Sequence, residues 1–276
     1  MQGNYVLIHH KNSTAGGSAR VGIRVTVWSQ TCETVTVTGP PNGAPASWAL
    51  NGKLTGAAVD LVRQTLMGAG VKKVEFVVFR SWADALGATR TGEVDLIISA
   101  GWSSERERYL SYVYPAYASQ FLKVIVRKGD EFALNSYTDL RGRVGVTERG
   151  VAFGDTSFGW IVENGLDLVR SNSVAESFDR LLAGQVDYVL AYENSAYSEI
   201  YTRDLGGRVR ELPTYPYRVD TFFAFSRRSK CASVLNAKLS AEIEKANKKH
   251  AYFQLNKKYR VIFNESQSAP VPAKQD

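Results

Sequence analysis

The chain has 276 residues, enough for two compact domains of roughly 150 residues each. Its composition, 44% hydrophobic and 22% charged, excludes disordered and fibrous classes, and no stretch reaches the roughly 20 apolar residues that span a bilayer. The net charge of +7 comes from scattered Lys and Arg residues, with small clusters at Arg227-Arg228 and Lys248-Lys249, so we expect a basic surface and no nucleic-acid partner.

Few residues in the chain offer the usual chemistry of catalysis or metal binding. The three histidines are His9, His10 and His250, and the sequence contains no HExxH, Gly-x-Ser-x-Gly or CxxC pattern. Cys32 and Cys231 are too few for a disulfide framework, and the sequence leaves open whether they pair. We therefore expect no metal site and no cofactor.

The two ends of the chain differ in composition from its middle. Residues 1–33 lack the basic start and apolar run of a secretory signal, and we interpret them as a leader or an N-terminal extension. Residues 263–276 include a small, polar stretch with two prolines, which predicts a disordered tail.

Between these ends, apolar strands alternate with amphipathic helices, which is typical of α/β architecture. The first half predicts strands at 34–38 and 74–79, helices at 59–67 and 82–91, and a further apolar strand at 96–99. Ser81, with Asp84 three residues later, is placed to cap the second helix. Gly92-Glu93-Val94-Asp95 then connects that helix to the last strand.

The second half of the chain repeats this unit. Ser173 and Glu176 open a helix predicted to run through Ala183, and Gly184-Gln185-Val186-Asp187 leads into an apolar strand at 188–191. Continuous apolar strands belong to parallel sheets that helices cover on both faces. Ligands of such sheets bind beyond the carboxyl ends of the strands, so a site is expected at 99–106 and 192–195.

The segment 99–106 leaves a strand and enters a short helix. Ser103 or Ser104 can cap this helix, where free backbone N–H groups favour an anion. Arg106 can add a planar guanidinium that binds a carboxylate through two hydrogen bonds. An ordinary capped turn with surface arginines, of which Arg108 is an equal example, is the alternative interpretation.

Four motifs in a fixed order carry a family resemblance. They are the run from Asn51 to Leu61, the segment from Trp82 to Asp95, the segment from Ser99 to Arg106 followed by Tyr112–Tyr117, and the run from Asp139 to Val146. Through them, residues from about 34 to 260 resemble the bacterial extracellular solute-binding proteins of family 3, which deliver polar amino acids to ABC importers.

The resemblance implies an α/β fold of the type II periplasmic-binding-protein kind. Its two lobes would each be a mostly parallel sheet flanked by helices, and two hinge crossings would lie near Val124–Arg127 and Thr221–Phe225. The first lobe would comprise residues 34–124 and 222–262, and the second lobe residues 125–221.

The resemblance also assigns residues to a ligand site between the lobes. Arg106 should bind the α-carboxylate of the ligand, and Trp48 should stack on the ligand side chain, with a packed loop anchor as the alternative for Trp48. Trp82 is expected to pack its own helix. The full set of expected ligand-binding residues is Trp48, Ser99, Gly101, Ser103, Arg106, Val151, Ala152, Tyr192 and Glu193.

Two departures from the family pattern fall in the second lobe. Tyr192 stands where the family places the Asp that binds the α-ammonium, and Glu193 follows it. A shift of the strand by one residue would bring Glu193 to that position, but it would also reverse the direction of the side chain. Alternatively, the Tyr192 ring could contact a substituted amine through a cation–π interaction. Where the family has a turn with hydroxyl side chains, this chain has Gly150-Val151-Ala152. These residues keep the backbone N–H donors and lose the hydroxyl donors.

The expected function is the periplasmic substrate-binding component of a bacterial ABC importer. The protein would be a monomer that closes on a small carboxylate-bearing solute, an amino acid or a derivative, and would deliver it to a permease in the inner membrane. One alternative is an enzyme on the same scaffold, similar to cyclohexadienyl dehydratase, with Glu148 and Glu193 as acid–base candidates. The other alternative is the ligand-sensing module of a receptor.

Overall fold

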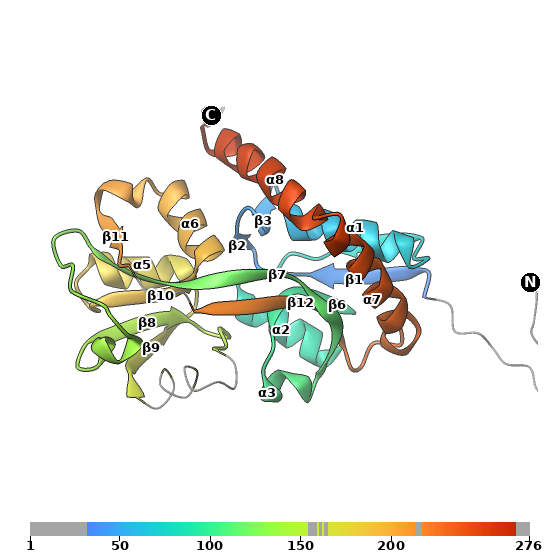
Figure 1. Cartoon of the computed structure of the whole chain (residues 1–276), viewed down its shortest axis with the longest axis horizontal. Helices are drawn as coiled ribbons and strands as arrows, with labels where there is room; N and C mark the ends of the chain where they lie inside the picture. Colours follow the sequence, from blue (N-terminus) through green and yellow to red (C-terminus); the bar gives the residue numbers. More distant parts are fainter. Residues whose placement is uncertain (1–31, 154–158, 160–161, 163–164, 214–216, 269–276) are drawn as a thin grey trace, which may run out of the picture. The chain divides into compact units, whose positions relative to one another are not determined.

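A computed structural model describes residues 32–153, 159, 162, 165–213 and 217–268 (Figure 1). The expected leader therefore lies outside the described residues apart from Cys32 and Glu33. The backbone carbonyl of Glu33 accepts hydrogen bonds from the N–H groups of Lys72 and Lys73, at 2.8 and 2.9 Å. These last two residues of the expected leader are thus part of the folded domain.

Nine strands of the described residues form one continuous mixed sheet. In sheet order they are β5 (Lys73–Phe76), β1 (Thr34–Thr38), β6 (Leu96–Gly101), β12 (Arg218–Ser226), β7 (Leu110–Arg127), β10 (Tyr188–Tyr192), β8 (Val144–Glu148) and β9 (Asp167–Ser171), with β11 (Val209–Glu211) pairing with β7. A small second sheet contains β2 (Asn42–Gly43), β3 (Ser47–Leu50) and β4 (Lys53–Thr55).

Helices flank the sheet along its whole length (Figure 1). The α-helices are α1 (Ala57–Gly68), α2 (Trp82–Thr91), α3 (Ser104–Glu107), α5 (Val174–Leu182), α6 (Glu193–Thr202), α7 (Ala232–Lys248) and α8 (Ala251–Ser268). Two short 3-10 helices are η1 (Tyr137–Leu140) and η2 (Leu205–Gly207).

The strands β7 and β12 connect the two lobes. Strand β7 pairs with β12 from Leu110 to Phe121 and then with β10 from Leu122 to Ile125. Strands β5, β1 and β6 lie beyond β12 in the first lobe, and β10, β8 and β9 lie beyond β7 in the second. This arrangement confirms the predicted two-lobe α/β fold, although residues 124–127, expected at the crossing, already belong to the second lobe's sheet.

Each lobe contains parallel strands with helices packed on both faces. In β6, Leu96 and Ile98 pack in the core formed with α1 and α7, whereas Ile97 and Ala100 pack against α2. Successive side chains of a strand point to opposite faces, so a strand covered on both sides must be apolar at every position. This is why residues 96–98 of β6 and all of β10 appear in the sequence as uninterrupted apolar runs.

The repeated Gly-x-Val-Asp tetrapeptide performs the same structural task in both lobes. Gly92 and Gly184 adopt positive φ values of 83° and 72°, which let the chain turn sharply after α2 and α5. The Asp95 carboxylate then accepts a hydrogen bond from the backbone N–H of Thr36 in β1 at 2.9 Å. Asp187 accepts one from Val144 in β8 at 2.7 Å. Each Asp thus fixes the start of its strand against the parallel neighbour.

The predicted N-terminal caps of the repeated helices are confirmed. The Ser81 hydroxyl accepts a hydrogen bond from the backbone N–H of Asp84, and the Ser173 hydroxyl accepts one from Glu176, both at 3.1 Å. In each case the side chain satisfies one of the free N–H groups of the first helical turn.

The C-terminal helix α8 extends further than the sequence suggested. It continues to Ser268, and the Phe263 side chain is only 1% exposed because it packs against Trp48, with ring centroids 5.4 Å apart. The disordered tail expected from residue 263 is therefore wrong for residues 263–268. Residues 269–276 lie outside the described residues.

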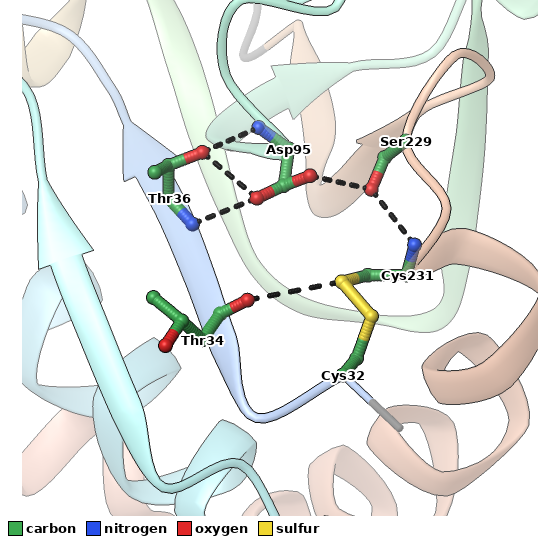
Figure 2. The surroundings of a disulfide bond; sticks show 6 residues. All are labelled: Cys32, Thr34, Thr36, Asp95, Ser229 and Cys231. Carbon is green, nitrogen blue, oxygen red and sulfur yellow. Dashed lines mark hydrogen bonds between the residues drawn. A yellow bond between two sulfur atoms is a disulfide. The ribbon is translucent and has the colours of Figure 1, made fainter. Parts of the chain in front are cut away.

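A disulfide bond joins Cys32, just before β1, to Cys231 at the start of α7 (Figure 2). Next to it, the Ser229 hydroxyl donates to the Asp95 carboxylate at 2.7 Å and accepts from the backbone N–H of Cys231 at 3.1 Å. Figure 2 shows how these contacts join β1, the turn before β6 and the start of α7. The bond lies within the first lobe and links residues 199 positions apart.

Replacing both Cys32 and Cys231 by Ser should lower the free energy of unfolding by about 2–5 kcal/mol, because the open chain regains entropy when it unfolds. Urea denaturation of the wild type and the double variant, with and without dithiothreitol, measures this difference. The reductant should shift the wild-type midpoint and leave the variant unchanged. An identical wild-type midpoint in both conditions would contradict the stabilising role of the bond.

Candidate functional site

A cavity of about 40 Å³ lies between the lobes at the carboxyl ends of β6, β8 and β10. The first lobe lines it with Pro40, Gly43, Ala46, Trp82, Ser99, Gly101, Arg106 and Gln120. The second lobe lines it with Glu148, Val151, Tyr192, Asn194 and Ser195. The position agrees with the rule that open α/β sheets bind ligands beyond their strand ends.

Arg106 is the buried cation of this cavity. The short helix α3 positions it: Ser103 caps the helix by accepting a hydrogen bond from the Arg106 backbone N–H at 3.3 Å. The side chain is 4% exposed, and its guanidinium donates to the backbone carbonyls of Gly101 at 2.8 Å and Gly150 at 2.5 Å. Both of these acceptors are neutral, so the cavity wall carries a positive charge that an anionic ligand would balance.

The carbonyl of Gly150 is a contact point between the lobes. It accepts from the Arg106 guanidinium and also from the indole N–H of Trp82 at 3.1 Å. The guanidinium carbon of Arg106 lies 5.7 Å from the centroid of the Trp82 ring. Trp82 was expected only to pack its helix, but it also lines the cavity and orients the second-lobe turn.

Trp48 occupies a different place from the one expected. Its side chain is 3% exposed and packs edge-on against Tyr259 and Phe263 of α8, with centroids 6.0 and 5.4 Å away. Among the described residues, the cavity lining does not include it. The structure thus corrects the expected ligand-stacking role: Trp48 anchors its loop because α8, absent from the motif pattern, covers its ring.

The other first-lobe residues expected at the site lie at or beside the cavity. Ser99 lines it with a positive φ of 61°, and its hydroxyl forms a hydrogen bond of 2.9 Å with the Tyr117 hydroxyl. Gly101 lines it with a carbonyl that also accepts from the Tyr112 hydroxyl at 2.9 Å. Ser103 caps α3, the helix that carries Arg106, and lines a neighbouring hollow and not the main cavity. A strained residue such as Ser99 often marks a functional position.

The second-lobe turn and Tyr192 are brought together. The Tyr192 hydroxyl donates to the carbonyl of Ala152 at 2.6 Å, and burial raises the pKa of this phenol, which stays neutral. Val151 and Tyr192 line the main cavity, whereas Ala152 lines the neighbouring hollow. The Tyr192 hydroxyl is thus already engaged within the second lobe.

Glu193 is not brought to the cavity. It is the first residue of α6 and is half-buried; burial raises the pKa of its carboxyl, with Lys123 and Arg260 opposing the effect. Among the described residues, the lining instead includes the next two, Asn194 and Ser195. Glu193 is therefore not a wall residue of this cavity, and a role for it in ligand binding stays a prediction.

Glu148, at the end of β8, is the carboxyl that the cavity contains. Its side chain is 6% exposed, and its Oε1 atom has no hydrogen-bond partner among the described residues. Burial raises the pKa of Glu148 to about 7, the backbone N–H of Trp82 lowers it, and the charge of Glu199 raises it further. Sequence reasoning considered this residue only as an acid–base group of the enzyme alternative.

The family is decided by a match over most of the chain. Residues 35–262 match the family model described as bacterial extracellular solute-binding proteins, family 3. The chain belongs to this family. A curated relative is the L-cystine-binding protein TcyJ of Escherichia coli K12, which is 25% identical over 143 residues, 51% of each chain. The chain thus spans about half the length of the curated relatives it matches.

Solved structures show the same fold as this family 3 protein. A histidine kinase sensor domain with similarity to periplasmic binding proteins has a TM-score of 0.69 at 24% identity, covering 82% of this chain and 95% of its own. The amino acid ABC transporter substrate-binding protein AbpA of Streptococcus pneumoniae, bound to L-arginine, has a TM-score of 0.67 at 19% identity, covering 86% and 97%.

Within the described ranges, no cluster of three or more His, Cys, Asp or Glu side chains is arranged to hold a metal ion. None of the helices that the structure describes combines the length and apolar character needed to cross a bilayer.

The sequence analysis missed the apolar wall residues Pro40, Gly43 and Ala46 and three polar residues that belong to no motif. Asn194 and Ser195 lie in the segment 192–195 that the strand-end rule had indicated, but no pattern distinguished them from Glu193. Gln120 lies on β7 next to the change of strand partner at Phe121 and Leu122. Only knowledge of the crossing point could have placed Gln120 at this family 3 site.

The buried carboxyl of Glu148 predicts a pH-dependent stability. Its pKa rises from 4.5 to about 7 on folding, so the folded chain holds a proton between these pH values that the unfolded chain releases. The free energy of unfolding should therefore fall as pH rises from about 4.5 to 7, by up to about 3 kcal/mol.

The variant Glu148→Gln should lose this contribution, because an amide does not ionise. Urea denaturation at pH 5 and pH 8 compares it with the wild type and with Glu244→Gln, an exposed control on α7. The stability of Glu148→Gln relative to wild type should be higher at pH 8 than at pH 5. Equal pH dependence in the two proteins would contradict the assignment.

Proposed function

We propose that this protein is the substrate-binding component of an ABC importer and captures a small carboxylate-bearing solute, an amino acid or a derivative, between its lobes. The observation that carries the proposal is the buried Arg106 guanidinium at the cavity, whose acceptors are two neutral backbone carbonyls. A carboxylate accepts two parallel hydrogen bonds from a guanidinium and neutralises its charge, which a carbonyl cannot do. The L-cystine-binding relative and the L-arginine-bound AbpA agree with this ligand class.

Capture would proceed by hinge closure. The cavity lies between the two lobes and is lined from both, so an amino acid would enter when the lobes separate. Arg106 comes from the first lobe, while Gly150 and Tyr192 come from the second. A ligand that touches both sides would favour the closed arrangement by its stronger binding to that state.

The lobe boundaries follow from the strand pairing. We place the crossing of β7 between Phe121 and Leu122, where its partner changes from β12 to β10. The return crossing is next to it, since the Leu122 N–H donates to the carbonyl of Tyr217 at 3.0 Å, just before β12. The first lobe would then end at residue 121 and resume at 218, a few residues away from the boundaries expected from the sequence.

The disulfide supports a location outside the cytoplasm. Structural disulfides form and persist in oxidising compartments such as the bacterial periplasm, and the family is described as extracellular. We place the protein in the periplasm as a monomer, from which it would pass its ligand to a permease in the inner membrane.

The decisive test of the proposed function is binding. Isothermal titration calorimetry against the twenty proteinogenic amino acids, L-cystine and the matching 2-hydroxy acids should identify at least one ligand with a carboxylate. Turnover assays with prephenate and arogenate address the dehydratase alternative and should stay flat. Correctly folded protein that binds no member of the panel would contradict the proposal.

Replacing Arg106 by Ala should weaken binding of every carboxylate ligand by at least about 100-fold, because the truncation removes a desolvated charge partner. Arg108→Ala is the matched control, since Arg108 is exposed at the end of the same helix. Calorimetry measures both affinities, and circular dichroism checks the fold. Binding by Arg106→Ala at wild-type affinity would exclude Arg106 as the carboxylate partner.

A further inference from the structure

Helix α8 extends from the first lobe toward α6 of the second lobe (Figure 1). On the first lobe, the Tyr259 hydroxyl donates to the Asp60 carboxylate of α1 at 2.5 Å. Further along the helix, Phe263 packs against Trp48, with ring centroids 5.4 Å apart. These contacts fix α8 to the first lobe, so any contact that it makes with α6 joins the two lobes.

The Phe263 ring is enclosed by aromatic rings from both lobes. Besides Trp48 of the first lobe, its neighbours are Tyr197 and Tyr201 of α6, with ring centroids 6.0 and 5.7 Å from that of Phe263. The two tyrosines also stack on each other, with centroids 5.7 Å apart. These distances are typical of favourable aromatic pairs. Phe263 is only 1% exposed, and the second lobe supplies part of its cover.

Polar contacts add to this aromatic cluster. The Tyr197 hydroxyl donates to the Oδ1 atom of Asn264 on α8 at 2.7 Å. The guanidinium carbon of Arg260, also on α8, lies 4.9 Å from the centroid of the Tyr197 ring, within the range of a cation–π interaction. Tyr197 thus contacts α8 through both its ring and its hydroxyl. The family match ends at residue 262, and Phe263 and Asn264 follow it directly.

The start of α6 also lines the ligand cavity. Asn194 and Ser195 belong to the cavity wall, and Tyr197 follows two residues later on the same helix. Burial raises the pKa of the Tyr252 phenol on α8, and a hydrogen bond with the Asn194 side chain is among the contacts that lower it. Because α6 is a continuous helix, a separation of the lobes that widens the cavity at Ser195 also moves Tyr197 away from α8.

Separating α6 from α8 would expose aromatic surface to water. The Phe263 ring would lose the cover of Tyr197 and Tyr201, and exposure of buried apolar surface costs free energy. The Tyr197 hydroxyl would exchange its hydrogen bond to Asn264 for one to water, at a smaller cost. The contact between the helices therefore favours the closed arrangement whether or not a ligand is present.

We propose that α6 and α8 form a clasp that holds the two lobes together when no ligand is bound. The clasp consists of Tyr197, Tyr201, Phe263 and Asn264. Such a clasp acts on the motion of the lobes whichever ligand they enclose. The ligand would then add its own contacts to a closed arrangement that the clasp already populates.

Pulsed electron paramagnetic resonance on the ligand-free protein, prepared by exhaustive dialysis, tests the clasp. Nitroxide labels on Lys53→Cys in β4 of the first lobe and Arg208→Cys after η2 of the second report the distance between the lobes. Both positions are exposed. The native Cys32 and Cys231 are joined in the disulfide and do not take the label.

The labelled wild type should populate mainly the closed arrangement. Replacing both Tyr197 and Tyr201 by Ala should raise the ratio of separated to closed molecules by about tenfold or more, because the contacts of two aromatic rings are lost. Tyr197→Phe keeps the ring and loses the hydrogen bond to Asn264, so it should raise the ratio less than about threefold. Circular dichroism checks that each variant is folded.

Two matched controls remove aromatic rings that make no contact between the lobes. Tyr114→Ala removes a half-exposed ring that packs on Phe222 within the first lobe, and Phe253→Ala removes an exposed ring of α8 itself. Both should keep the wild-type distance distribution. A folded variant lacking Tyr197 and Tyr201 with the wild-type distribution, or controls that shift it equally, would overturn the clasp. A ligand-free wild type that is mostly separated would also overturn it, and calorimetric binding would still support the carboxylate-binding function.

Discussion

The antiparallel pairing of β7 and β12 is the interaction on which the rest of the structure depends. These two strands lie in the middle of the nine-stranded sheet. The remaining strands of the first lobe follow β12 on one side, and those of the second lobe follow β7 on the other. The pairing of β12 with both neighbours becomes irregular between Thr221 and Ala224, where the register shifts. Such irregularities bend and twist a strand locally. Gln120, which lines the cavity from β7, pairs with Val219, two residues before this irregular stretch.

The turn at Gly150 is a place where the two lobes meet. Its carbonyl accepts hydrogen bonds from Arg106 and Trp82, both of the first lobe. The group best suited to a ligand carboxylate is therefore engaged in a contact between the lobes. A bound carboxylate would have to compete with this carbonyl for the guanidinium of Arg106. The carboxylate is the stronger acceptor of the two because it carries a negative charge.

The order of helices and strands could be predicted because the sequence shows both the helical spacing and the strand alternation of apolar residues. The helix at 82–91 and the strand at 34–38 have the predicted bounds, and the caps at Ser81 and Ser173 form as expected. The repeated Asp was visible as a pattern, but its hydrogen bond to the neighbouring strand was not. Local patterns carry local structure, whereas the partner of a side chain depends on the tertiary fold.

The candidate site was predictable only where strand ends determine it. Arg106 lies in the short helix after β6, and Tyr192 is the last residue of β10. Both lie near strand ends, where a ligand site was expected, and both line the cavity. Trp48 was misplaced because its environment is decided by α8, which is about 200 residues away along the chain. The importance of Glu148 emerges only from its burial and its unpartnered oxygen, which no spacing in the sequence reveals.

The bond between Cys32 and Cys231 turns most of the protein into one covalent ring. Every described residue that lines the cavity, and both crossing strands, lie inside this ring. A protease that cuts one surface turn between the two cysteines would therefore leave the fragments joined through sulfur. Both halves of the ligand site would remain in a single molecule, held at high local concentration and able to reassociate.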